Sequence, residues 1–173
     1  MSASPFSFSR IVPSLDGDTN LVRVAWDKLS PAPGGKVIFS KLVGRMAAYT
    51  GSVGARVEIL RPGYSEVSMR DRPSVRNHLR SIHAIALANL AELTGNIAVA
   101  YGMPDDARFI VSGLHMSYLK KARGTVRGVC EAPVPTTNAR EEIDVHVRIV
   151  DASGEVVTTA ILNTLIGPKP SRT

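Results

Sequence analysis

The sequence predicts an α+β fold in which one antiparallel sheet of about six strands wraps around a long, buried helix. Residues 83–101 are rich in alanine and leucine, which favours a helix, and they are apolar nearly all round. A helix of that kind must be buried on most sides. Two strand-like segments precede it and four follow it, so a single sheet is able to enclose it.

The first third of the chain has the spacing of helices. Apolar residues in 19–29 recur at helical intervals, and the prolines and glycines of 31–35 end that segment. A second segment, 36–49, carries apolar residues on one side and Lys36, Lys41 and Arg45 on another, which predicts an amphipathic helix over one edge of the core. We therefore expect a single domain over 1–173, with a helical extension at 1–50 and a core at 51–167.

From residue 55 the period changes to that of strands. Two short runs, 55–61 and 64–69, flank Pro62 and Gly63 and predict a hairpin. The clearest later strand is 142–150, where apolar and polar residues alternate strictly, and the turn residues at 151–155 predict an antiparallel neighbour. The four later strands are expected at 109–119, 124–131, 142–150 and 156–166.

Length and composition favour one ordinary globular domain. The chain has 173 residues, of which 44% are hydrophobic and 21% charged. Its single cysteine, Cys130, cannot form an internal disulfide, and the N-terminus lacks the continuous apolar run of a signal peptide. Polar residues interrupt the apolar stretch 83–101, so we do not expect it to span a membrane. These features predict a cytoplasmic protein.

The charge of the chain favours anionic partners. The net charge is +6 and the pI is about 9.8, which attracts phosphorylated cofactors, nucleic acids and acidic surfaces alike. Aromatic residues make up only 5%, and the basic residues do not form one long run. Because stacking platforms would be scarce, we do not expect nucleic-acid binding.

Asn89, Glu92 and Asn96 form a polar stripe on the long apolar helix. A helix advances about 100° per residue, so the spacing of three and four residues places them on one narrow face. A carboxylate on a mostly buried helix must be hydrogen-bonded, paired or open to a cleft. In a cleft Glu92 is a candidate general base. The alternative is that Glu92 caps a loop or pairs with an arginine of a partner subunit.

Polar residues gather just before the same helix. Asn77, His78 and His83 precede its first turn, where the positive end of the helix dipole favours an anion or a developing oxyanion. A metal site is the rival interpretation. We expect none, since the chain has one cysteine and no paired histidine pattern beside a carboxylate.

The stretch 77–95, NHLRSIHAIALANLAELTG, resembles the hotdog thioesterases of the phenylacetic-acid-pathway type, and more closely the hotdog group called DUF4442. The likeness begins near Lys36, passes through GRMAAYTGSV and YLKKARG, and continues to the last strands. It covers most of the chain. The resemblance implies a hotdog fold, a homodimer or homotetramer, and hydrolysis of acyl-CoA thioesters without a cofactor.

The resemblance also implies roles for individual residues. In the family pattern an asparagine precedes a His-Gly-Gly motif, and a helix acid follows that histidine by nine positions. Asn77, His83 and Glu92 match this pattern. The acid would act as nucleophile or as base for water, Asn77 and His83 would hold substrate or water, and the backbone N–H of Ile85 would polarise the thioester carbonyl.

Two departures from the pattern concern glycine. The two glycines after the histidine are Ala84 and Ile85, and the usual glycine between Asn77 and His83 is absent, with Arg80 nearby. Glycine permits close approach of a ligand to the backbone, so the isoleucine side chain is expected to narrow the pocket. A non-catalytic acyl-CoA binding protein that has lost turnover is therefore the alternative to a thioesterase. A hotdog dehydratase is a third possibility, but its histidine-bearing pattern is not evident.

Basic residues are the candidates for the phosphates of coenzyme A. Lys120, Lys121 and Arg123 follow a predicted strand, and Arg80 belongs to a group of arginines around the helix start. Lysine and arginine form charge-assisted bonds to phosphate oxygens. We expect these four residues and Asn89 to bind substrate, against the alternative of a solvated basic rim.

One sheet around one helix leaves an edge and the polar stripe uncovered, which predicts oligomerisation. The long strand that begins near Phe109 is the expected edge.

Overall fold

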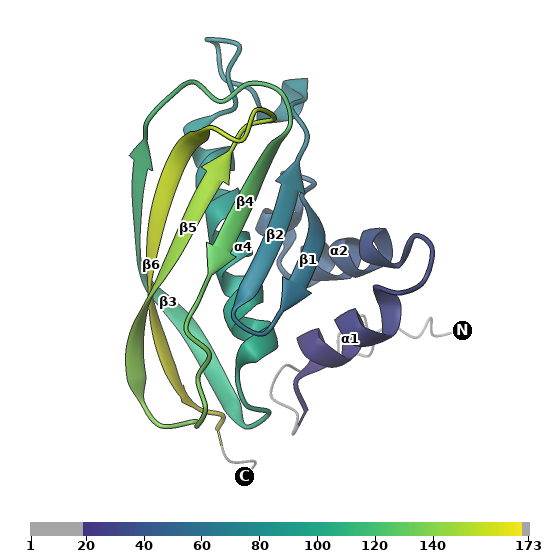
Figure 1. The fold of residues 1–173 in the computed structure, drawn as a ribbon, viewed down its shortest axis with the longest axis vertical. Helices are drawn as coiled ribbons and strands as arrows, with labels where there is room; N and C mark the ends of the chain where they lie inside the picture. Colours follow the sequence, from purple (N-terminus) through teal and green to yellow (C-terminus); the bar gives the residue numbers. More distant parts are fainter. Residues whose placement is uncertain (1–18, 171–173) are drawn as a thin grey trace, which may run out of the picture.

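The computed structural model describes residues 19–170 and shows a six-stranded antiparallel sheet curved around a long helix (Figure 1). The strand order is β1-β2-β4-β5-β6-β3, so β1 and β3 form the two edges of the sheet. This is the predicted architecture. The strands are β1 (Arg56–Arg61), β2 (Tyr64–Met69), β3 (Ala107–Tyr118), β4 (Val126–Glu131), β5 (Glu141–Val150) and β6 (Val156–Pro168).

The helices lie on the concave side of the sheet and beside β1. They are α1 (Leu21–Leu29), α2 (Gly35–Met46), α3 (Ala48–Gly51) and α4 (Ala84–Gly102), with a short 3₁₀ turn, η2 (Pro73–Val75), before α4. The segment 36–49 was expected to form one helix. It forms two, α2 and α3, because Ala47 between them leaves the helical conformation. The first eighteen residues of the expected helical extension lie outside the described residues.

The helix α4 packs directly on the sheet because small residues meet at the contact. A Cβ on Gly128 of β4 would lie 2.3 Å from Oγ1 of Thr94, so only glycine fits there. Ser65 of β2 donates a hydrogen bond of 2.6 Å from Oγ to the carbonyl of Thr94. By length and composition α4 is apolar enough to cross a membrane, but 67% of it is buried within the protein, as befits a core helix.

Asn20 ties the start of α1 to the end of α4. Its Oδ1 caps α1 by accepting the N–H of Arg23, and its Nδ2 donates 2.7 Å to the carbonyl of Ala100 in the last turn of α4. The rings of Trp26 and Phe39 meet edge to face, with centroids 5.1 Å apart, and join α1 to α2. These contacts fix the N-terminal helices against the core.

The two edge strands of the sheet, β1 and β3, differ in whether a helix covers them. At β1, Nζ of Lys36 donates to the carbonyl of Glu58 and Oγ of Ser40 accepts the N–H of Val57, so α2 covers that edge. The edge strand at the other end is β3, as expected from sequence. It exposes Ile110, and no other described element covers its outer edge.

Candidate functional site

The site is built around the first half of α4. His83 is the N-cap of this helix, in an extended conformation, and its Nδ1 accepts the backbone N–H of Ile85 at 3.1 Å. The amide that the family pattern would assign to oxyanion binding is therefore already engaged by a side chain. The Ile85 side chain itself is 53% exposed and lies on the open side of α4.

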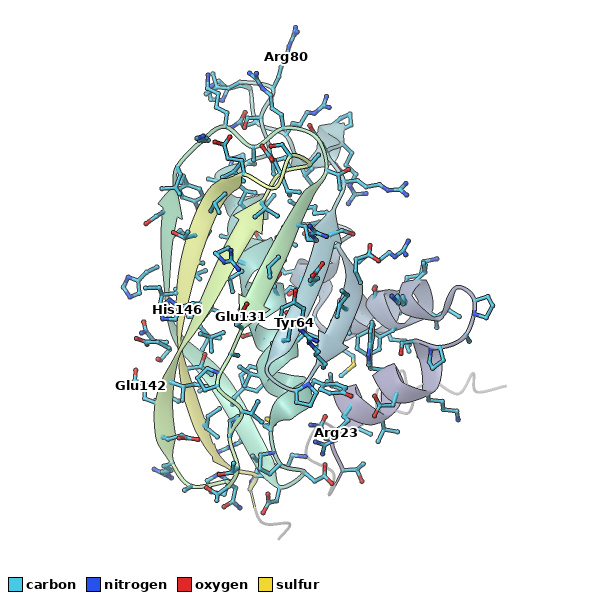
Figure 2. All side chains as sticks on the ribbon, viewed as in Figure 1. Arg23, Tyr64, Arg80, Glu131, Glu142 and His146 are labelled. Atoms are coloured by element: carbon cyan, nitrogen blue, oxygen red, sulfur yellow. The ribbon has the colours of Figure 1, made fainter. Side chains whose placement is uncertain are left out.

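The loop before α4 is held by Asn77. Its Oδ1 accepts the N–H groups of Leu79 (2.9 Å) and Ser81 (3.2 Å), and its backbone N–H donates to the carbonyl of Ser81. Arg80 sits inside this loop with a φ of 54°, in the left-handed region that favours glycine. The backbone thus adopts a glycine-like conformation although the residue is arginine. Figure 2 shows the Arg80 side chain pointing away from the rest of the molecule.

A hollow of about 360 Å³, which we call the helix-start hollow, lies beside the first turn of α4. Tyr118 at the end of β3 donates from its hydroxyl to the carbonyl of Ala84 (3.2 Å), and burial raises the pKa of this tyrosine. Lys120 is paired with Glu155. The lining residues are Asn77, Leu79, Ser81, Ile82, Ala84, Leu87, Tyr118, Leu119, Lys120, Lys121 and Ala122.

The polar stripe of α4 divides into buried and accessible parts. Asn89 is only 4% exposed; its Nδ2 donates 3.0 Å to the carbonyl of Tyr49, and its Oδ1 has no hydrogen-bond partner among the described residues. The buried Oδ1 of Asn96 likewise has none. Glu92, between them, is half-buried, and no ion pair holds it within residues 19–170. A free carboxylate thus lies beside two unsatisfied buried acceptors.

A larger hollow of about 1060 Å³, which we call the α2 cleft, opens between α2, α3 and β1. Buried Leu93 of α4, one residue after Glu92, is among its lining residues. Its cationic members are Lys41, Arg45, Arg56 and Arg70, and its single acid is Glu58. The sequence-based site did not include this cleft, although the basic face predicted for 36–49 was the signal for it.

The loops beside the α2 cleft are pinned by arginines. Arg72 donates 3.0 Å to the carbonyl of Ser52 and lies over Gly54, which adopts a φ of 60°. Asp71 accepts Nε of Arg76 at 2.6 Å and the N–H of Gly124 at 2.8 Å. The hydrogen bond from Arg76 lowers the pKa of Asp71. These two arginines therefore hold the loops together.

The structure brings only part of the expected set together. Asn77, Lys120 and Lys121 share the helix-start hollow, whereas Glu92 and Asn89 lie further along α4. Arg80, His83, Ile85 and Arg123 are exposed and line neither hollow, and Asn89 and Glu92 do not line them either. Among the described residues, no three side chains of histidine, cysteine, aspartate or glutamate gather as a metal site would require.

Comparison with known proteins places the chain in a family. The model of DUF4442, described as a domain of unknown function, matches residues 35–166. A search of curated proteins found no significant match. A crystal structure from a structural-genomics programme is 30% identical, covers 85% of this chain and 97% of that chain, and superimposes with a TM-score of 0.73.

Two further solved structures share the fold. A Pseudomonas aeruginosa protein of unknown function, called a probable thioesterase, is 23% identical with a TM-score of 0.68, covering 75% of this chain and 93% of that chain. A thioesterase family protein from Silicibacter pomeroyi is 15% identical with a TM-score of 0.64, covering 75% and 96%. The sheet wrapped around α4 is accordingly a hotdog fold, and the chain belongs to the DUF4442 family.

Proposed function

We propose that this protein hydrolyses acyl-CoA thioesters, with the carboxylate of Glu92 as the nucleophile or as the general base for water. The observation that supports this proposal is the partial burial of Glu92 together with its lack of an ion-pair partner among the described residues. Glu92 is half-buried on the open side of a core helix, and no described cation neutralises it. The reaction class is supported by three structural relatives, which are described as a probable thioesterase from Pseudomonas aeruginosa, a thioesterase family protein from Silicibacter pomeroyi and a thioesterase from Haemophilus influenzae.

Thioester hydrolysis requires an activated oxygen and a site for the oxyanion, and it requires no metal. Glu92 supplies the first, either by attacking the carbonyl carbon or by taking a proton from water. The amide of Ile85 lies seven residues before Glu92, a rise of about 10.5 Å at about 1.5 Å per residue, so the two groups of one protomer are too far apart to act on the same carbonyl. In the proposed dimer the Ile85 amide of the other protomer supplies the second, once the His83 ring turns aside and a carbonyl oxygen replaces Nδ1 as the acceptor. Asn77 keeps the helix-start loop in the conformation that presents this amide.

The active form in this proposal is a homodimer or homotetramer in the cytoplasm. The exposed edge of β3 supports the association, because unpaired backbone groups on an edge strand are ready to pair with a second copy. The whole chain is proposed to act as one domain.

The decisive experiment is a panel of acyl-CoA thioesters with detection of the released thiol. The protein's own Cys130 is fully buried and its thiol pKa is raised by burial to about 12, so it does not contribute signal while the protein is folded. Glu92→Gln keeps the size of the side chain and removes its charge. We expect kcat to fall about a hundredfold or more while substrate binding survives.

Glu131→Gln is the matched control, because Glu131 is exposed on the outer face of the sheet. Unchanged thioesterase activity in folded Glu92→Gln would remove Glu92 from the mechanism. A wild-type protein that binds acyl-CoA and hydrolyses none of the panel would instead be the non-catalytic binding protein.

A further inference from the structure

We infer that the α2 cleft, and not the basic residues that follow β3, holds the phosphate-bearing arm of coenzyme A. Lys41, Arg45 and Arg70 are assigned to the phosphates in this arrangement. The acyl group occupies the helix-start hollow, and the thioester crosses α4 beside Glu92. This assignment rests on the proposed acyl-CoA substrate.

The first observation is the charge balance of the cleft. Four cations and one acid line it, and the acid is already used: Glu58 accepts the hydroxyl of Ser68 at 2.7 Å and pairs with Arg56 at 3.1 Å. Within residues 19–170, Lys41, Arg45 and Arg70 make no salt bridge. Three exposed cations without counterions suit a strongly charged, partly solvated group such as a nucleotide phosphate.

The basic residues after β3 are a weaker candidate. Lys120 is neutralised by its pairing with Glu155, and Arg123 lines neither hollow. Of the basic residues that line the helix-start hollow, only Lys121 makes no salt bridge among the described residues, and one lysine is a poor match for three phosphates. The charge of coenzyme A is therefore better matched by the α2 cleft.

The volumes of the two hollows support the same assignment. The α2 cleft is about 1060 Å³ and the helix-start hollow about 360 Å³. Small-molecule sites span roughly 300–1,000 Å³, so the larger one accommodates the nucleotide and pantetheine, and the smaller one an acyl group of modest length. Apolar side chains of the smaller hollow, including Leu79, Ile82, Leu87 and Leu119, suit that acyl group.

The two hollows flank the open side of α4. Ala84 and Leu87 line the smaller one and Leu93 lines the larger one, with Asn89 and Glu92 between them in sequence. From Leu87 to Glu92 the helix rises about 7.5 Å at about 1.5 Å per residue, a span that a short acyl chain covers, and the pantetheine arm then enters the larger hollow past Leu93.

The test compares two substrates in a triple variant, Lys41→Gln, Arg45→Gln and Arg70→Gln. The same acyl group is offered as its coenzyme A thioester and as its N-acetylcysteamine thioester, which lacks the phosphates. We expect KM for the coenzyme A thioester to rise at least about tenfold with kcat unchanged. Kinetics on the N-acetylcysteamine thioester should not change. The control is a second triple variant, Arg127→Gln, Arg140→Gln and Arg148→Gln, which removes three positive charges from exposed residues that line neither hollow.

Equal losses on both substrates, or none on either, would overturn the assignment. A selective loss on the coenzyme A thioester in Lys120→Gln/Lys121→Gln instead would move the phosphates to the end of β3.

Calorimetry with coenzyme A alone separates this inference from the proposed reaction. If wild type hydrolyses no thioester but binds coenzyme A, and the triple variant weakens that binding at least about tenfold, the cleft assignment stands without the thioesterase. If wild type does not bind coenzyme A, the assignment of the α2 cleft is wrong.

Discussion

In the first turn of α4, Nδ1 of His83 lies 3.1 Å from the backbone nitrogen of Ile85 and accepts its N–H. The ring therefore performs the task that serine, threonine or aspartate usually performs at the start of a helix. The same N–H is the one proposed to polarise the thioester carbonyl. The hydrogen bond to His83, which stabilises the free protein, and the proposed hydrogen bond to the oxyanion therefore compete for the same N–H of Ile85.

Replacing His83 should separate these two uses. His83→Ala removes the cap, and we expect the free energy of unfolding to fall by about 1 kcal/mol, the usual cost of an N-cap deletion. Urea denaturation of both proteins measures it. His83→Asn restores a side-chain acceptor and should restore most of the loss. If His83→Ala were as stable as wild type, the hydrogen bond to Ile85 would contribute nothing to folding.

Arg80 offers an unusual opportunity to stabilise the protein with glycine. Its φ of 54° costs an L-residue about 1 kcal/mol, and glycine adopts this conformation freely. Because glycine also adds freedom to the unfolded chain, we expect Arg80→Gly to be between neutral and about 1 kcal/mol more stable. Arg80→Ala keeps the strain and serves as the control. Thermal or urea unfolding compares the two, and a clear destabilisation by both variants would show that the arginine side chain itself holds the loop.

Association through β3 is a separate prediction. Ile110 is 66% exposed on this edge strand, and charged residues on an edge discourage strand pairing. We expect wild type to sediment as a dimer or tetramer at micromolar concentration and Ile110→Lys to shift it toward the monomer. Ile59→Lys, on the opposite edge strand that α2 covers, should leave the oligomer intact. A wild-type monomer at that concentration would contradict the prediction.

The fold could be predicted because its signals are local. The strict alternation of 142–150 and the apolar run of 83–101 each specify one element, and β5 and α4 lie where these patterns indicated. The break at Ala47 was missed because the apolar periodicity continues across it. The close packing of Gly44 on Gly51 provides the reason for two helices, and that contact is invisible in a linear pattern.

The candidate site was harder to predict because it depends on contacts distant in sequence. Nothing in the spacing of basic residues showed that Glu155 would neutralise Lys120 or that Arg72 would bond to Ser52. The α2 cleft was missed for the same reason, since it forms only when α2 packs against β1. Spacing did identify Glu92 as a partly accessible residue of α4, but Asn89 of the same predicted stripe is buried, because α3 packs over it and its Nδ2 donates to the carbonyl of Tyr49.

The last prediction concerns Ile85, where this chain departs from the glycine of its hotdog relatives. Its side chain is 53% exposed and lies on the same side of α4 as Glu92, seven residues and nearly two turns earlier. It is therefore placed to crowd an acyl group whose carbonyl approaches the Ile85 amide. Ile85→Gly should widen that approach and raise kcat/KM on bulkier acyl thioesters, while lowering the free energy of unfolding by about 1 kcal/mol because glycine is a poor helix residue.

Ile85→Ala distinguishes crowding from backbone access. Alanine removes most of the side chain and favours the helix, so it should raise activity on bulky substrates without the loss of stability if crowding is the cause. If only Ile85→Gly raises activity, close approach to the backbone is what matters, because the remaining Cβ of alanine still blocks it. Unchanged rate and unchanged chain preference in both variants, against a wild type that hydrolyses thioesters efficiently, would show that Ile85 does not restrict the pocket.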